Sequence, residues 1–368
     1  MVGAVDALMA EAAHHRHEVR VEEDVGALRR AVAALARLLP GLRPGAAELA
    51  ATELATNILR HTTRGGYVLY RRAADGIDLL AVDHGPGMRP GGVPPWAVAR
   101  AAATPPPFTG SGLGVGLSGV RRHATVFDCY AAPEGTVVYA RIGPPAPPPD
   151  APLHWAGVNV PYGGAGESGD AWAVSTGPAS PTGSAGPRLA ALVVDGLGHG
   201  PGAAEAARAA VAEFGRWGLT DAEAFVERAN EAMRRTRGGV LAVCLIDPGR
   251  GELTFAGVGN VTGRLIVGGM GHSLLSRSGT LGTQLRAPRA HPVTYRWGPG
   301  AVLVLASDGL TSRCDPLAYP GLLRRHPAVV AATLQRDHGR GTDDATVLVV
   351  RDTREQDGSG GIDRGAVT

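Results

Sequence analysis

At 368 residues the chain is longer than one typical domain, so two domains of roughly 150 to 200 residues each are expected. A hydrophobic content of 44% and a net charge of +2 describe a soluble globular protein and exclude a disordered or fibrous one. All 36 basic residues are arginines scattered along the chain, which argues against a nucleic-acid partner and excludes the lysine-dependent Walker A and protein-kinase folds.

The chain also lacks the signals of export or membrane insertion. It has no run of about 18 apolar residues and no charged-then-apolar leader. Cys129, Cys244 and Cys314 are far apart and form no CxxC pair, which fits a reducing compartment. We therefore expect a cytoplasmic protein with no membrane partner.

The first part of the chain predicts helices followed by hairpins. Apolar residues recur at helical spacing over residues 24–39 and 44–61. Strand-like runs at 67–72 and 77–82 are joined by Asp75-Gly76, and a second pair at 125–130 and 136–142 turns at Pro133-Glu134-Gly135. This order indicates a helix layer over a mixed or antiparallel sheet, within a first domain at 1–142.

A dense proline run at 143–149 predicts a linker at 143–152. The second domain is expected at 153–352, with a flexible Gly- and Ser-rich tail at 353–368. Its expected strands lie at 189–194, 240–246, 253–257, 265–267, 302–306 and 346–350. Its expected helices lie at 203–217, 222–235 and 328–337, so the fold class of both domains is α+β.

Three groups of residues in the first domain have the character of a nucleotide site. Glu53 and Asn57 lie four residues apart and share one helix face, and Asp83 leaves a strand. Glycines that let a planar ligand or phosphates approach the backbone follow in two places: Gly85 and Gly87, then Gly110, Gly112, Gly114 and Gly116. Each group alone is common in turns and solvated helices, but their order together favours a nucleotide site. A Rossmann fingerprint is not expected, because the second glycine run follows a proline-rich loop.

The segments ELATNI at 53–58, DHGPG at 83–87 and GLGVGLSGVRR at 112–122 resemble the N, G1 and G2 boxes of the GHKL (Bergerat, HATPase) fold. The likeness is greatest to the RsbT-like anti-sigma-factor and switch-protein serine kinases. It implies an α/β sandwich that binds ATP and Mg²⁺. Asn57 would ligate the Mg²⁺, Glu53 would be the base that takes the proton of an acceptor serine, and Asp83 would accept a hydrogen bond from adenine.

Four aspartates in the second domain stand next to glycines or at the ends of expected strands. They are Asp170, Asp195, Asp308 and Asp343, in the segments SGD, DGLGHG, SDG and TDDAT. A single Asp-Gly pair is usually a turn. Four in sequence indicate hard oxygen ligands for two Mg²⁺ or Mn²⁺ ions that clamp a phosphate.

These segments resemble, in order, the motifs of PPM-type metal-dependent protein phosphatases, in particular the SpoIIE and RsbX branch. The resemblance implies an αββα sandwich in which Asp195 bridges two metals and the Gly196 carbonyl binds one of them. Asp308 and Asp343 would hold the other, and Asp170 would complete the site. Asp344, next to Asp343, is an alternative ligand by alignment.

Two further residues stay open. His199 is as much a hydrogen-bonding loop residue as an acid, and Asn260 either bends a strand or faces the site.

Together these resemblances imply a bacterial regulator that phosphorylates and dephosphorylates a serine or threonine. The implied partner is a STAS-domain anti-sigma antagonist or a stressosome-like protein, with a sigma-regulating phosphatase as a further option. One alternative is that the first domain is an ATP-loaded clamp that binds a protein without transferring phosphate. A more distant alternative, a degenerate phosphatase domain, conflicts with the presence of all four aspartates.

Overall fold

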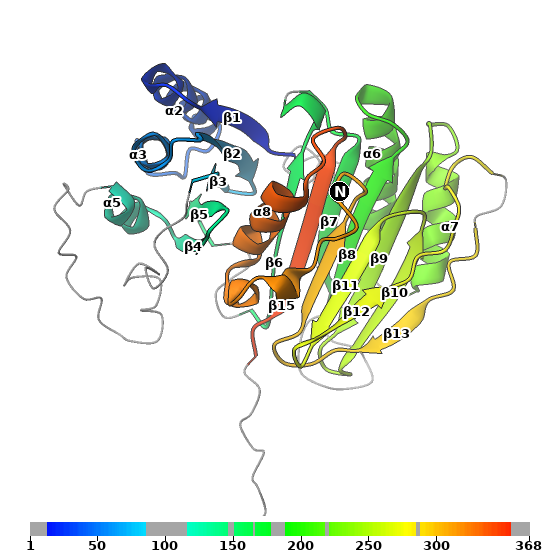
Figure 1. Ribbon diagram of the computed structural model, residues 1–368. Coiled ribbons are helices and arrows are strands. Elements are labelled where there is room, and N and C mark those ends of the chain that lie inside the picture. Colours follow the sequence, from blue (N-terminus) through cyan, green and yellow to red (C-terminus); the bar gives the residue numbers. More distant parts are fainter. Residues whose placement is uncertain are drawn as a thin grey trace, which may run out of the picture.

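The computed structural model describes residues 13–85, 116–145, 151–164, 166–177, 188–217, 221–284 and 288–354 (Figure 1). The first domain contains one five-stranded antiparallel sheet of strand order β1-β2-β3-β5-β4, with helices on one face. Its elements are β1 (His15–Val19), α2 (Glu22–Ala36), α3 (Ala46–His61), β2 (Gly66–Ala73), β3 (Gly76–Asp83), α5 (Gly116–His123), β4 (Val126–Ala132) and β5 (Gly135–Ile142).

The face of this sheet that the helices cover packs against apolar side chains of α3. Ala47, Ala51, Leu54 and Ile58 of α3 are buried in one cluster with the inner residues of β2 and β3. The Asp24 carboxylate accepts hydrogen bonds from the backbone N–H groups of Arg20 and Val21, which fixes the start of α2. The two long helices and both hairpins predicted from the sequence are therefore confirmed, within a few residues at each end.

The second domain has two five-stranded antiparallel sheets packed face to face, of strand order β13-β10-β9-β8-β7 and β12-β11-β14-β15-β6. Helices α6 and α7 lie against the first of these sheets, and α8 lies against the second. The strands are β6 (Leu153–Val160), β7 (Asp170–Gly177), β8 (Arg188–Gly196), β9 (Gly239–Asp247), β10 (Glu252–Val258), β11 (Thr262–Val267), β12 (Met270–Leu274), β13 (Val293–Arg296), β14 (Val302–Ala306) and β15 (Ala345–Asp352). The helices are α6 (Pro201–Arg216), α7 (Ala222–Met233) and α8 (Pro327–His338), with short 3₁₀ turns η2 (Tyr162–Gly164), η3 (Pro316–Ala318) and η4 (Leu322–Arg324). The expected strands and helices are present, and β1, β6, β7, β12 and β13 are additional to them.

The core between the two sheets is formed by alternating residues of both. Ala191 and Val193 of β8 pack in one cluster with Leu303 and Leu305 of β14 and with Leu348 of β15. Within the described parts of the chain, no helix combines the length and the apolar character needed to cross a membrane.

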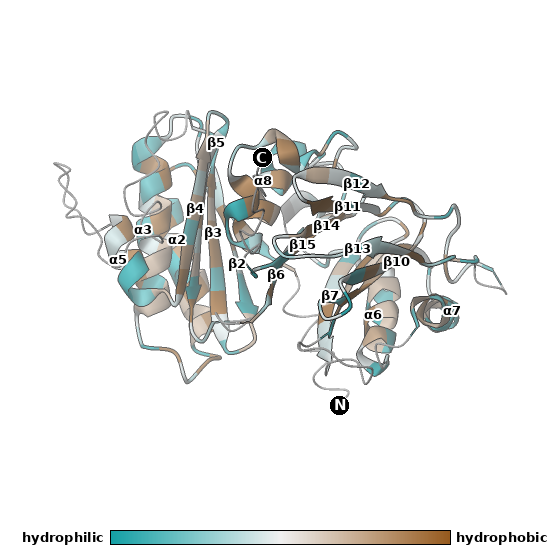
Figure 2. Cartoon of the chain, turned by 90° about the horizontal axis from the view of Figure 1, so that it is seen from below, coloured by the Kyte–Doolittle hydropathy of each residue, from teal (hydrophilic) through white to brown (hydrophobic). Residues whose placement is uncertain are grey.

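Helix α8 is buried on two sides, because the first domain covers the side that its own sheet leaves open. Figure 2 shows the sheet of the first domain between its own helices and α8. Tyr67, Leu69, Leu80 and Val82 on this second face share one buried cluster with α8, β6 and β15. The Tyr67 hydroxyl lies 3.1 Å from the Gln335 side-chain oxygen on α8. The two domains therefore share a continuous apolar core.

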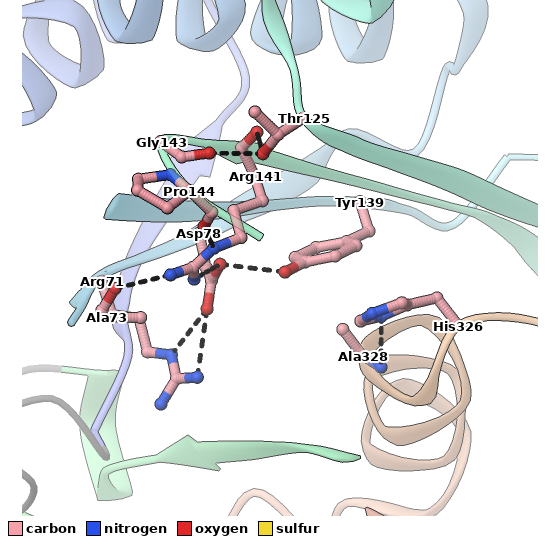
Figure 3. A network of polar contacts seen from close by, with 10 residues as sticks. All are labelled: Arg71, Ala73, Asp78, Thr125, Tyr139, Arg141, Gly143, Pro144, His326 and Ala328. Atoms are coloured by element: carbon pink, nitrogen blue, oxygen red, sulfur yellow. Dashed lines mark hydrogen bonds and ion pairs between the residues drawn. The ribbon is translucent and has the colours of Figure 1, made fainter. Parts of the chain in front are cut away.

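A buried ionic network lies on the same face (Figure 3). The Asp78 carboxylate accepts hydrogen bonds from Arg141 at 2.8 Å, from the Tyr139 hydroxyl at 2.9 Å and from Arg71 at 3.1 Å. Burial alone would raise the pKa of Asp78, but the two guanidinium groups outweigh it and hold the pKa below its usual value. The Tyr139 ring stacks on His326, which caps the N-terminus of α8, at 4.7 Å between centroids. Polar and apolar contacts thus join the domains together.

Candidate functional site

The four aspartates predicted to bind metal all lie at strand ends on facing sheets. Asp170 opens β7 and is the register partner of Asp195, which is the second-last residue of β8. Asp308 follows β14, and Asp343 precedes β15, the antiparallel neighbour of β14. The ends of these four strands therefore bring the carboxylates toward one another.

Burial and the neighbouring carboxylates both raise the pKa values of two of these aspartates. Burial raises the pKa of Asp195 to about 9, and the charges of Asp170, Asp308 and Asp343 add to the shift. Burial also raises the pKa of Asp170 to about 7. The charge of Asp344 adds to this shift, whereas a hydrogen bond with the Ser307 side chain opposes it. The site therefore gathers carboxyl groups whose ionised forms are costly in the absence of a cation.

The residues present fit divalent cations. One carboxylate oxygen of Asp170 is buried and has no hydrogen-bond partner among the described residues, and the donor set is all oxygen, as Mg²⁺ and Mn²⁺ prefer. No three of the described carboxylates are gathered into a ready-made ligand set for one ion.

Two glycines at this edge are required by close packing. A Cβ at Gly196 would lie 2.2 Å from the Ala203 carbonyl oxygen, and one at Gly309 would lie 2.0 Å from the Asp344 carbonyl oxygen. The chain after Asp195 and Asp308 therefore passes against backbone with no room for a side chain. This explains the repeated Asp-Gly pattern seen in the sequence.

Asp343 and Asp344 have different surroundings. The two Asp344 oxygens accept the backbone N–H groups of Tyr162 and Gly169, both at 2.7 Å, and Asp344 is only 3% exposed. Asp343 is half-buried, and one of its oxygens accepts the backbone N–H of Asp344 at 2.9 Å. Asp344 therefore fastens the loops around the site, and the assignment of Asp343 as the ligand stays a prediction.

The two residues left open lie at the rim. The Asn260 amide donates to the Asp308 carboxylate at 2.7 Å, so Asn260 faces the site. His199 is exposed, and its ring lies 5.4 Å from that of Tyr162. The structure therefore places both beside the aspartates.

The nucleotide residues are partly described. Glu53 and Asn57 are half-buried on α3, and a Cβ at Gly116, where α5 begins, would lie 3.5 Å from a Glu53 oxygen and 3.7 Å from the Asn57 oxygen. The Asn57 amide nitrogen is buried without a partner among the described residues. Glu53 and Asn57 thus face Gly116, and Asn57 retains an unused N–H donor of the kind that can bond a phosphate oxygen.

Asp83 lies at the end of β3, where one of its oxygens accepts the backbone N–H groups of Gly85 at 2.9 Å and Thr136 at 3.0 Å. These bonds fix the orientation of the carboxylate. Four of the glycines predicted to contact nucleotide lie outside the described residues: Gly87, Gly110, Gly112 and Gly114.

Comparisons with known proteins give two family matches. Residues 19–142 match the family model described as a histidine kinase-like ATPase domain, and residues 185–352 match that of stage II sporulation protein E (SpoIIE). The phosphoserine phosphatase RsbX of Bacillus subtilis is 31% identical over 125 residues, which are 33% of this chain and 61% of RsbX. The chain thus spans less than two thirds of the length of that relative.

Solved structures are similar to about half of this chain. One, from work on the bacterial stressosome as a modular system adapted to control secondary messenger signalling, has 26% identity and a TM-score of 0.47, covering 54% of this chain and 99% of its own. The structure of RsbX in complex with magnesium has 22% identity and a TM-score of 0.45, covering 54% of this chain and 94% of its own. With the family matches, the strand order and the flanking helices, the expected fold class is confirmed in both domains.

Proposed function

Because the chain joins a histidine kinase-like ATPase domain to a SpoIIE-type domain, we propose that it is a signalling regulator whose second domain is a metal-dependent protein phosphatase. The observation that carries this proposal is the set of aspartates at the facing sheet edges, with raised pKa values at Asp170 and Asp195. A site with this charge and these oxygen ligands suits two divalent cations and a phosphate ester.

Each residue has a role in this proposal. Asp195 would bridge two Mn²⁺ or Mg²⁺ ions, the Gly196 carbonyl would bind one, Asp308 and Asp343 would hold the other, and Asp170 would complete the site. Two such ions supply an activated water and neutralise the charge of the phosphoryl group when bound. Asn260 would orient Asp308 through its 2.7 Å hydrogen bond.

The proposed substrate is a phosphoserine or phosphothreonine in a partner protein. The relative RsbX is described as a phosphoserine phosphatase, which supports this class of substrate. We propose a STAS-domain anti-sigma antagonist or a stressosome-like protein as the partner.

For the first domain we propose ATP and Mg²⁺ binding, with transfer of phosphate to the same partner. Glu53 would act as the base, Asn57 would hold the metal, and Asp83 would accept a hydrogen bond from the adenine amino group. Support comes from Glu53 and Asn57, which lie side by side against Gly116 at the start of α5.

A second function is favoured by the shared core. The face of the first domain that carries Tyr67 and Leu69 is packed on α8, and the chain leads from α8 directly to Asp343. An ATP-loaded first domain that transfers no phosphate would then act as a clamp that controls the fused phosphatase.

One experiment separates these functions. The full chain is incubated with candidate STAS proteins, ATP and Mn²⁺ or Mg²⁺, and phosphate on the partner is followed by intact mass. Glu53→Ala should keep ATP binding and lose phosphoryl transfer by about 10²-fold or more, because a general base contributes that much. Asp195→Ala should let phosphorylated partner accumulate. If no candidate is phosphorylated while ATP binds tightly, the kinase proposal fails and the clamp replaces it.

A further inference from the structure

Strand β6 is one edge strand of one sheet of the second domain and β7 is one edge strand of the other, and the two strands pack on each other near the proposed metal site. A Cβ at Gly157 of β6 would lie 2.4 Å from the Trp172 ring of β7, so the Trp172 side chain packs directly against the backbone of β6. Two residues further along β6 and two residues back along β7, Asn159 faces Asp170.

Asn159 bonds the backbone of the proposed metal ligand. Its side-chain N–H donates to the Asp170 carbonyl oxygen at 2.9 Å, and Asn159 is 1% exposed. Because β7 is an edge strand, its outer carbonyl groups have no strand partner, and a buried carbonyl without a donor is costly. Asn159 supplies that donor at the residue where position matters most.

The backbone of Asn159 is held in turn by the first domain. The backbone N–H of His14, just before β1, donates to the Asn159 carbonyl oxygen at 2.8 Å. The Asn159 backbone N–H points at His14 Nδ1 at 3.4 Å, and His14 is 2% exposed. Nearby, the Arg71 guanidinium lies 5.0 Å from the centre of the Trp172 ring. The first domain therefore contacts the packed β6–β7 pair at two points.

We propose that Asn159 is a positioning residue for the metal site, which fixes Asp170 opposite Asp195 and is itself held by His14 of the ATPase domain. The inference rests on the proposed metal-dependent phosphatase. It adds that the first domain is part of the structure that sets metal affinity, whether or not nucleotide is bound. Outer-shell partners of metal ligands commonly change metal affinity by about 10- to 100-fold. The bond here is to the ligand's backbone, so we expect the lower end of that range.

The test compares Asn159→Leu with Asn230→Leu in the full chain. Leucine has a similar volume and no amide donor. Asn230 is also buried, at 3%, and also bonds backbone, accepting the N–H of Gly282 at 2.9 Å, so it controls for the loss of a buried amide. Mn²⁺ binding to metal-stripped protein is measured by calorimetry, and 4-nitrophenyl phosphate hydrolysis is measured against Mn²⁺ concentration.

We expect Asn159→Leu to bind Mn²⁺ about tenfold more weakly and to recover its turnover at saturating Mn²⁺, whereas Asn230→Leu binds as wild type does. Equal Mn²⁺ affinity in Asn159→Leu and wild type would overturn the inference. If wild type itself neither binds Mn²⁺ nor hydrolyses the ester, it is the proposed phosphatase function that fails.

A second pair tests the contact with the first domain and serves if Asn159→Leu does not fold. His14→Pro removes the N–H that bonds Asn159, and His14→Ala keeps it. We expect about threefold weaker Mn²⁺ binding in His14→Pro than in His14→Ala. Equal binding in these two variants would show that the first domain does not support the site.

Discussion

Asp78 in the first domain and Asp170 in the second are both buried aspartates, at 5% and 4% exposure, in opposite electrostatic surroundings. Asp78 lies between Arg71 and Arg141, which hold its pKa down. Asp170 has Asp195, Asp308 and Asp344 around it, and burial raises its pKa to about 7. A buried charge that the protein neutralises itself supports the fold. A buried charge that it leaves without a cation indicates a ligand from outside.

The first test of this difference between the two domains measures the rate of phosphate ester hydrolysis. Asp195→Ala should lower 4-nitrophenyl phosphate hydrolysis by roughly 10³-fold or more, because it removes the proposed bridge between two metals. Steady-state rates at saturating Mn²⁺ measure this, with Asp315→Ala, an aspartate of the same domain that pairs with Arg264 at 3.1 Å, as the control. Hydrolysis that is unchanged and resists a chelator would sink the site assignment.

The second test is the stability of the balanced aspartate. Asp78→Asn should lower the free energy of unfolding by about 3–5 kcal/mol, because Arg71 and Arg141 would stay buried without their counter-charge. Denaturant unfolding measures it, with Asp75→Asn in the neighbouring exposed turn expected to change little. If the two variants unfold alike, the network does not stabilise the fold.

The third test asks whether the stabilisation of the fold by Mn²⁺ depends on Asp195 or on Asp78. Mn²⁺ at about 100 times its Kd should stabilise wild type by about 2.7 kcal/mol, because it binds only the folded state. Asp78→Asn should keep this increase from its lower starting point, and Asp195→Ala should lose it. Thermal unfolding with Mn²⁺ and with chelator gives both values, and an increase that survives in Asp195→Ala contradicts the metal site.

The smallest expected effect is an increase, not a decrease, in the free energy of unfolding. In chelator at neutral pH, Asp195→Asn should raise the free energy of unfolding by on the order of 1 kcal/mol, because it removes a buried carboxyl group whose pKa is higher in the folded than in the unfolded state. Asp315→Asn should not. A loss of stability in Asp195→Asn, as expected for Asp78→Asn, would show that the two buried aspartates do not differ in the way proposed.

The sequence predicted the elements with strong periodicity and the residues at their ends. Strands β8, β9, β14 and β15 are runs of buried aliphatic residues, and the motif aspartates follow or precede them as expected. The edge strand β4 was predicted, but the other edge strands, β1, β6, β7, β12 and β13, were not. In β1, HRHEV, only Val19 is buried, so no alternation marks it, and β6 contains Gly157, which normally argues against a strand and is needed here against Trp172.

The contacts between distant segments could also not be predicted from the sequence. Helix α8 was predicted, but its second buried face depends on the sheet of another domain, and no local pattern encodes that. Asp344 and Asn159 bond backbone atoms of other segments, and only their spatial neighbours distinguish them from ordinary polar residues. The domain limits at 142 and 153 stay a prediction, since a proline run marks a linker without describing the packing around it.

The shared core around α8 has a consequence for the covalent chain itself. A cut between residues 146 and 150 would break the polypeptide but leave Tyr67, Leu69 and Leu80 packed on α8, so the two fragments should remain together as a non-covalent heterodimer. The first fragment produced alone would instead expose that apolar face to water and should self-associate. The peptide connection is thus dispensable for holding the halves together, whereas each half is the other's solubilising partner.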